Sequence, residues 1–286
     1  MNADRKLLVA HRGASAYAPE HTLAAYRLAI EQGADFVEQD LAVTKDGVLV
    51  CIHDPSLERT TNVEEVFPDR FVEDTAGGKP RRRWFVYDFT LAEIKRLDAG
   101  AWFDAKFAGA RVPAWDEAVA AVRGRAGLFP ELKAPELYRA RGVEMADLLV
   151  ASLRRHKLAE GAPVMVQSFD PESLRRVARA MPALPRVLLV EPADAARWLT
   201  AESLKEAAAF ATGIGPSKFI LEDDPEVVRR AHAAGLTVMP YTFRQSRAGA
   251  PLPRFATVRD EMAYFLFTLG VDGLFTDNPD QFPRKP

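Results

Sequence analysis

Apolar runs of strand length alternate with amphipathic stretches along most of the chain. The strand-like runs cover residues 7–11, 35–44, 127–131, 163–168, 186–191, 211–215, 236–242 and 271–276. Apolar residues at helical spacing predict helices over 20–32, 115–123, 137–156, 171–181, 195–209, 225–234 and 257–269. Strands that alternate with helices are typical of parallel βα units. The pattern predicts an α/β fold, a (β/α)8 TIM barrel, with an open doubly wound sheet as the alternative.

One strand-like run, residues 48–53, follows the second predicted strand without a helix between them. Asp46-Gly47 is a strong signal for a two-residue hairpin turn. Such a turn places Asp40 directly opposite His53, and opposed residues of a hairpin share one face. The sequence therefore predicts a carboxylate beside a histidine.

Residues 54–113 show no further βα unit and are predicted to be a small insertion after this hairpin. The 286 residues otherwise suit one barrel domain spanning 1–286, since such barrels typically have about 250 residues. Apolar residues make up 48% of the chain, enough for a sizeable core. The formal net charge of -2 gives no indication of nucleic-acid binding.

No apolar run approaches the roughly 18 residues that would span a bilayer. Only MNADRK precedes the first strand, too little for a signal peptide, so we expect a cytoplasmic protein, or a periplasmic or secreted one if the N-terminus has been processed. The single cysteine, Cys51, lies in the apolar run VLVCI and is expected to be a small buried hydrophobe.

Ionisable residues gather where the predicted strands end, the position of the active site in a (β/α)8 barrel. They are His11, Arg12, Glu38, Asp40, Glu131 and Lys133, with His53 on the hairpin. Each could be a satisfied core residue or a salt-bridge partner. Charge at a buried strand end is costly unless it is paired or bound to a metal, so the set as a whole indicates a site.

The residue types indicate phosphodiester chemistry. Three carboxylates (Glu38, Asp40, Glu131) suit a hard divalent cation, Mg²⁺ or Ca²⁺. Arginine and lysine beside such a cation form a clamp for phosphate. Two histidines can activate a nucleophile and protonate a leaving group near neutral pH. No GxGxxG or GxxxxGK[ST] loop follows the first strand, which argues against nucleotide binding.

Several segments together resemble the glycerophosphodiester phosphodiesterase family: HRGASAYAPEHT, GADFVEQD, TKDGVLVCIHDPSLERTT, FPELK, VQSFD, AHAAGLTV and GVDGLFTDNPD. The resemblance implies a (β/α)8 barrel and hydrolysis of glycerophosphocholine or glycerophosphoethanolamine to sn-glycerol 3-phosphate and an alcohol. It also implies that His11 and His53 are the general acid/base pair, that Arg12 and Lys133 contact phosphate, and that the metal ligands are Glu38, Asp40 and Glu131.

Two positions depart from the family's usual residues: His21 stands in place of Asn, and Gln39 in place of Leu. With FPDRF, YDFTLAEIK and YTFR, they resemble the bacterial periplasmic-type branch, which prefers Ca²⁺. We therefore expect one divalent cation, with Ca²⁺ slightly favoured over Mg²⁺. His21 precedes a predicted helix, and both a site contact and a helix-capping role stay open.

Gln167, Phe169 and Tyr241 lie at or next to strand ends and are expected to contact substrate, with core packing as the alternative. The expected partner is a small phosphodiester, and a homodimer is left open. Two other functions compete with hydrolysis of glycerophosphodiesters: a phospholipase D-like lyase that acts on intact lipids, and a non-catalytic phosphodiester-binding barrel.

Overall fold

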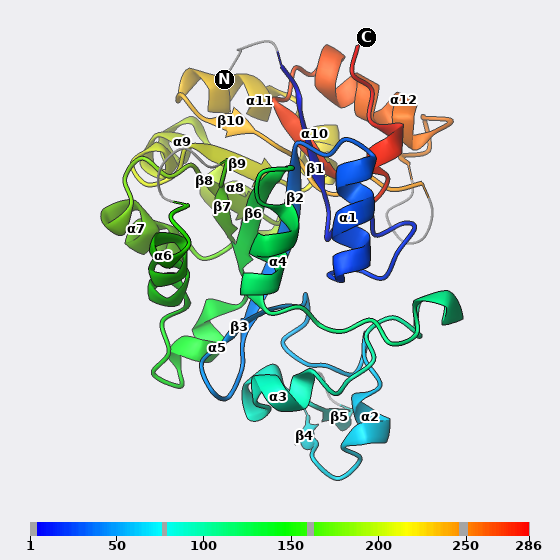
Figure 1. The fold of residues 1–286 in the computed structure, drawn as a ribbon. Coiled ribbons are helices and arrows are strands. Elements are labelled where there is room, and N and C mark those ends of the chain that lie inside the picture. Colours follow the sequence, from blue (N-terminus) through cyan, green and yellow to red (C-terminus); the bar gives the residue numbers. More distant parts are fainter. Residues whose placement is uncertain (1–4, 76–78, 159–162, 246–250, 286) are drawn as a thin grey trace.

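Eight parallel strands form the centre of the molecule in the computed structural model, which describes residues 5–75, 79–158, 163–245 and 251–285 (Figure 1). They are β1 (Leu7–Ala10), β2 (Phe36–Val43), β6 (Gly127–Leu132), β7 (Val166–Ser168), β8 (Arg186–Val190), β9 (Gly213–Pro216), β10 (Thr237–Val238) and β11 (Gly273–Thr276). Their order in the sheet is β10-β9-β8-β7-β6-β2-β1-β11. Each predicted strand is thereby confirmed.

The two ends of this sheet are joined by backbone hydrogen bonds. The amide of Asp272 donates to the carbonyl of Val238 at 2.9 Å, and that of Phe275 donates to the carbonyl of Pro240 at 3.0 Å. An isolated parallel bridge pairs Phe243 with Thr276. The sheet therefore returns on itself, which favours the (β/α)8 barrel over the open doubly wound sheet.

Helices alternate with the strands and cover the outside of the barrel (Figure 1). They are α1 (Leu23–Glu31), α4 (Trp115–Val122), α5 (Pro135–Arg139), α6 (Met145–Arg155), α7 (Pro171–Ala180), α8 (Ala195–Trp198), α9 (Ala201–Ala208), α10 (Lys218–Asp223), α11 (Glu226–Ala233), and α12 (Val258–Ala263), which continues as a π-helical turn, η4 (Tyr264–Thr268). Among the described residues, no helix has the length and apolar character needed to cross a membrane.

Two predicted helices are each divided in the structure. The stretch 137–156 falls on α5, which begins two residues earlier, and on α6. The two helices are separated at Gly142, whose φ of +74° lies in the left-handed region. The stretch 195–209 contains α8 and α9, because Thr200 caps a new helix by accepting a hydrogen bond from the amide of Ser203. The short helix α10 was not predicted, since six residues are too few to display a helical period.

The hairpin after β2 has a different register from the predicted one. Strand β3 (Leu49–Cys51) pairs antiparallel with β2, Leu41 opposite Cys51 and Val43 opposite Leu49. The loop has three residues, 45–47, and ends at Gly47 with a φ of +77°. Three-residue hairpin loops with a left-handed glycine are common. The predicted pairing of Asp40 with His53 is wrong by one residue: the amide of Ile52 donates to the carbonyl of Asp40 at 2.9 Å.

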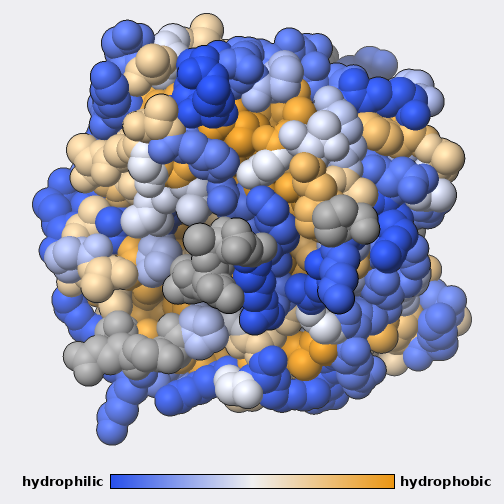
Figure 2. All heavy atoms as spheres, turned by 90° about the horizontal axis from the view of Figure 1, so that it is seen from above, coloured by the Kyte–Doolittle hydropathy of each residue, from blue (hydrophilic) through white to orange (hydrophobic). Residues whose placement is uncertain are grey.

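Residues 54–113 lie between β3 and α4, and the part of this segment that the structure describes contains short elements only. These are α2 (Val63–Val66), the antiparallel pair β4 (Val72–Asp74) and β5 (Arg81–Arg83), η1 (Val86–Asp88), α3 (Leu91–Ile94) and η2 (Ala105–Phe107). Figure 1 shows α2, α3, β4 and β5 beyond the end of the barrel at which the strands finish. Figure 2 views the molecule from above the orientation of Figure 1, and on this face hydrophobic residues lie among hydrophilic ones.

The interior of the barrel is filled by an apolar cluster of Val9, Phe36, Phe129, Met165, Val187, Leu189, Met239 and Phe275. The rings of Phe129 and Phe275 lie 5.2 Å apart, and Phe129 also packs against Phe36 at 5.9 Å. Phe169 and Tyr241 pack on this cluster. The barrel interior is therefore a packed core and not a pore.

Candidate active site

A cavity of about 190 Å³ opens at the ends of the strands. All ten residues predicted from the sequence to form the site line it, and five others join them: His11, Arg12, Glu38, Asp40, His53, Glu131, Lys133, Gln167, Phe169, Leu189, Glu191, Tyr241, Thr242, Arg244 and Phe275. The barrel thus brings together side chains that are far apart in the sequence.

Three buried carboxyl groups meet on one side of the cavity. Glu38 and Asp40 point from β2, and Glu131 is the register partner of Asp40 on β6. Each of the three offers an oxygen within 4.8 Å of the others. Burial and the neighbouring carboxyls raise the pKa of Glu38 well above its usual range. Burial likewise raises the pKa of Glu131 to about 8, although Lys133 opposes the shift.

Burial and the mutual repulsion of the carboxylates disfavour ionisation of Glu38 and Glu131, whereas Lys133 and His21 outweigh burial and hold the pKa of Asp40 well below its usual range. One carboxylate oxygen, Oδ1 of Asp40, is buried without a hydrogen-bond partner. A buried carboxylate oxygen with no donor is costly unless a cation takes the donor's place. An all-oxygen donor set suits a hard divalent cation, so Glu38, Asp40 and Glu131 fit a metal site.

Hydrogen bonds from two side chains and one backbone amide orient Glu38 and Asp40. Nε2 of Gln167 donates to Oε1 of Glu38 at 2.7 Å, and the backbone amide of Arg12 donates to Oε2 at 2.9 Å. His21 Nε2 lies 2.8 Å from Oδ2 of Asp40. Gln167 is completely buried, and because its amide donor is engaged by Glu38, it contributes to the shape of the carboxylate cluster.

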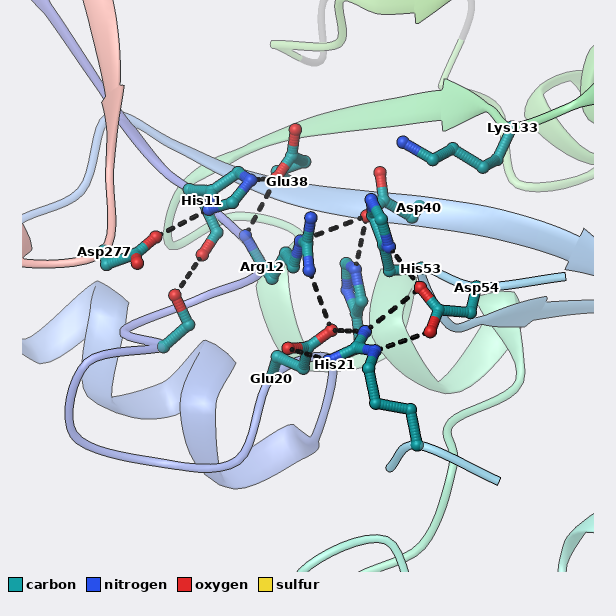
Figure 3. Close-up of polar contacts among 12 residues, drawn as sticks. His11, Arg12, Glu20, His21, Glu38, Asp40, His53, Asp54, Lys133 and Asp277 are labelled. Carbon is teal, nitrogen blue, oxygen red and sulfur yellow. Dashed lines mark hydrogen bonds and ion pairs between the residues drawn. The ribbon is translucent and has the colours of Figure 1, made fainter. Parts of the chain in front are cut away.

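Each histidine of the predicted pair is bound to an aspartate through Nδ1. His11 Nδ1 lies 2.6 Å from Oδ1 of Asp277, and His53 Nδ1 lies 2.6 Å from Oδ1 of Asp54 (Figure 3). Nε2 is therefore the nitrogen left for chemistry in both rings, and that of His11 lies 3.8 Å from Glu38. A carboxylate on Nδ1 selects the tautomer and holds the ring, as in a Ser-His-Asp triad.

The surroundings of both rings favour the neutral imidazole. Burial, with the positive charge of Arg12, lowers the pKa of His11 to about 4, although Asp277 opposes the shift. Burial also lowers the pKa of His53, against the influence of Asp54. A neutral imidazole that donates through Nδ1 can accept a proton at Nε2. Sequence reasoning assigned no role to Asp54 or Asp277, although Asp54 directly follows His53.

Three cations face the same cavity. Arg12 lies two residues after the end of β1 and has a left-handed backbone conformation, with a φ of +58°. Lys133 Nζ lies 3.0 Å from Oε1 of Glu131. Arg244, which was not predicted, has its Nε 3.3 Å from Oδ2 of Asp277. Cations beside a buried carboxylate cluster produce a bipolar site, able to hold a divalent cation and an anion side by side.

The insertion contributes an arginine that links the two histidine-bearing segments. Arg59 donates to both oxygens of Glu20 at 3.0 and 2.7 Å, and it also contacts both oxygens of Asp54. Glu20 in turn accepts a 3.0 Å hydrogen bond from Arg12 (Figure 3). Sequence reasoning missed this clamp, in which Arg59 holds Glu20 and Asp54, because nothing in the sequence pattern indicates where the insertion returns to the barrel.

The opposite wall of the cavity is aromatic. Phe169 and Tyr241 pack edge to face with ring centroids 6.0 Å apart, and Lys133 Nζ lies 5.5 Å from the Phe169 ring. The Tyr241 hydroxyl donates to the carbonyl of Val190 at 3.2 Å. This wall offers an apolar surface beside the charged half of the site.

Proteins with known structures and sequences match almost the whole chain. A glycerophosphodiester phosphodiesterase from Bacillus subtilis (strain 168) is 36% identical over 99% of this chain and 87% of its own length. Its counterpart from Haemophilus influenzae is 30% identical over 96% of this chain and 88% of its own.

Two solved structures match at the level of the fold. That of glycerophosphodiester phosphodiesterase from Agrobacterium tumefaciens str. C58 has a TM-score of 0.68 and 30% identity, over 97% of this chain and 98% of the other. The structure of an Oleispira antarctica phosphodiesterase in complex with the product sn-glycerol-3-phosphate has a TM-score of 0.73 and 25% identity, over 97% of this chain and 95% of the other.

The family model of glycerophosphoryl diester phosphodiesterases matches residues 11–281, which include every residue that lines the cavity. With the barrel, the carboxylate cluster and the two histidines already in place, the match agrees with the resemblance seen in the sequence motifs. The chain is an enzyme and belongs to the glycerophosphoryl diester phosphodiesterase family.

Proposed function

We propose that the cavity binds glycerophosphodiesters such as glycerophosphocholine and glycerophosphoethanolamine and hydrolyses them to sn-glycerol 3-phosphate and an alcohol. The observation that carries this proposal is the arrangement of two aspartate-bound histidines beside a carboxylate cluster and three cations. The Oleispira antarctica relative, whose structure holds sn-glycerol-3-phosphate, supports the same product for this chain.

We assign one divalent cation to Glu38, Asp40 and Glu131, with Ca²⁺ ahead of Mg²⁺. The ion preference rests on the resemblance to the periplasmic-type branch of the family. When bound, the cation screens the negative charge of the phosphate and makes a hydroxyl near it easier to deprotonate. Arg12 and Lys133 would bind the phosphate oxygens from the other side, where their charge stabilises the transition state more than the ground state.

The two histidines would move the protons. One neutral ring accepts a proton at Nε2 from the attacking water as the water oxygen bonds to phosphorus. The other ring enters the step as an imidazolium, with protons on both nitrogens, and donates its Nε2 proton to the alkoxide as the bond between that oxygen and phosphorus breaks. The proton count balances, since one ring gains the proton that the other loses. General acid/base groups of this kind each typically contribute about 10²–10⁴-fold in rate. Phe169 and Tyr241 would pack against the carbon atoms of glycerol or of the alcohol, and Gln167 would hold Glu38 in place.

The test is release of sn-glycerol 3-phosphate from glycerophosphocholine by the purified protein, with Ca²⁺ or Mg²⁺ present. We expect turnover that disappears in His11→Asn and His53→Asn while both variants keep the wild-type circular dichroism. Lack of activity on every glycerophosphodiester would refute the proposal. Mass spectrometry of the product separates hydrolysis, which gives a linear phosphomonoester, from the lyase reaction, which gives a cyclic phosphate.

A further inference from the structure

His21 contacts a ligand of the proposed metal site from outside the cavity. Its ring is buried between Asp40 on β2 and Tyr26 on α1. Nε2 lies 2.8 Å from Oδ2 of Asp40, and Nδ1 lies 3.0 Å from the hydroxyl oxygen of Tyr26. Figure 3 shows His21 reaching toward Asp40 from the segment that carries Glu20. Both ring nitrogens are therefore engaged.

The direction of these hydrogen bonds follows from the groups involved. An Asp40 carboxylate has no proton to give, so Nε2–H of His21 donates to it. The Tyr26 hydroxyl can either donate to Nδ1 or accept from it. Tyr26, His21 and Asp40 thus form one buried chain of hydrogen-bonded groups.

The two oxygens of Asp40 have different surroundings. Oδ2 receives the hydrogen bond from His21, and Arg12 Nε lies 3.5 Å from the same oxygen. Oδ1 is buried and has no hydrogen-bond partner. The protein therefore holds the Asp40 carboxylate through Oδ2, and Oδ1 stays available to bind a metal cation.

The backbone of His21 is consistent with a role in the site. Its φ of +53° lies in the left-handed region, and its amide donates to the carbonyl of Arg12 at 3.1 Å. A residue other than glycine keeps this backbone conformation only when the surrounding structure fixes it. Helix α1 does not require His21 as a cap, because Thr22 accepts the capping hydrogen bond from Ala25 at 3.2 Å.

We infer that His21 is a positioning residue for the metal site: it holds Asp40 through Oδ2 so that Oδ1 faces the cation, and Tyr26 fixes the His21 ring. The inference rests on the proposed metal-dependent function. Partners behind metal ligands typically affect metal affinity by about 10- to 100-fold when they are removed.

The test is calorimetric titration of the metal-free full chain with Ca²⁺ and, separately, Mg²⁺, without substrate. His21→Gly removes the ring and tolerates the left-handed backbone. We expect about 10- to 100-fold weaker binding in this variant. His21→Asn, whose amide can still donate, should recover part of the affinity. Tyr26→Phe should weaken binding in the same direction by a smaller factor.

Tyr138→Phe is the matched control, because the Tyr138 ring is also buried but packs against Tyr87 of the insertion. It should keep wild-type affinity. If the wild type binds neither cation, the proposed metal site is refuted and this inference with it. If the wild type binds and folded His21→Gly binds as tightly, only the inference is overturned. If His21→Gly does not fold, Tyr26→Phe becomes the deciding variant, and wild-type cation affinity in Tyr26→Phe overturns the inference.

Discussion

His11 and Asp277, near opposite ends of the chain, are joined at 2.6 Å from Nδ1 to Oδ1. Strands β1 and β11 are neighbours in the barrel, with Ala10 opposite Thr276, so the residue after each strand meets the other. The pairing of the first strand with the last thus completes a histidine–aspartate pair. The pair orients one of the two rings proposed to carry protons.

Asp277→Asn should reduce kcat by about 10²–10⁴-fold while the protein stays folded, because an amide no longer selects the tautomer that donates through Nδ1. Steady-state release of glycerol phosphate measures the effect. Asp280→Asn is the control: Asp280 lies nearby but bonds to the hydroxyl of Tyr17, not to a histidine. Equal kcat values in the two variants would remove Asp277 from the mechanism.

Arg59→Ala should lower kcat/KM by roughly tenfold, because it releases both Asp54, which orients His53, and Glu20, which holds Arg12. The cost in stability should be only about 0–1 kcal/mol at pH 7, because the Arg59 side chain is 41% exposed and water screens its ion pairs. Kinetics and urea unfolding measure the two effects separately. An unchanged kcat/KM would show that the clamp does not organise the site.

The same clamp predicts a dependence of stability on pH. Burial disfavours the ionised form of Glu20 and Asp54, but Arg59, with Arg12 or His53, outweighs it and lowers both pKa values. A lowered folded-state pKa means that the unfolded chain binds protons first on acidification, so the stability from these carboxylates is complete above pH 5 and is lost below it.

Arg59→Ala should therefore lose less stability than the wild type when the pH falls from 7 to 3.5, in urea unfolding at each pH. Arg229→Ala is a suitable control, since its pair with Glu226 lies on the surface with both side chains more than half exposed. If Arg229→Ala reduced the loss of stability at acidic pH as much as Arg59→Ala does, the clamp would not be the source of that loss.

Much of the fold and the cavity could be predicted from the sequence, and the reasons are physical. Parallel strands buried on both faces appear as continuous apolar runs, so each of the eight strands was evident. Charges at strand ends converge because the barrel places all such ends on one rim. The hairpin register was missed because an Asp46-Gly47 turn predicts a two-residue loop, whereas the loop also includes Lys45 and the amide of Thr44 donates to the carbonyl of Val48.

Contacts between distant segments could not be predicted in this way. Asp277 meets His11 across 266 positions, and Arg59 meets Glu20 across 39. Neither pairing leaves a period or a spacing in the sequence. The same holds for His21, whose position one residue before the cap of α1 did not show that its ring turns toward Asp40.

The carboxylate cluster predicts opposite effects of pH on the metal-free and metal-bound protein. Burial raises the pKa of Glu131 to about 8, and the pKa of Glu38 is also raised. The folded metal-free chain then holds protons that the unfolded chain has already released. Its stability should therefore fall as the pH rises through this range.

A bound cation should reverse this trend, because the ligands bind it as carboxylates and must release their protons. We expect Ca²⁺ affinity to increase from pH 6.5 to 8.5. Cation at about 100 times its dissociation constant should add about 2.7 kcal/mol to the free energy of unfolding. Urea unfolding with EDTA and with Ca²⁺ at pH 6.5, 7.5 and 8.5 measures both trends. Glu131→Gln should flatten the metal-free curve, and a curve as steep as the wild type's would place the titrating group elsewhere.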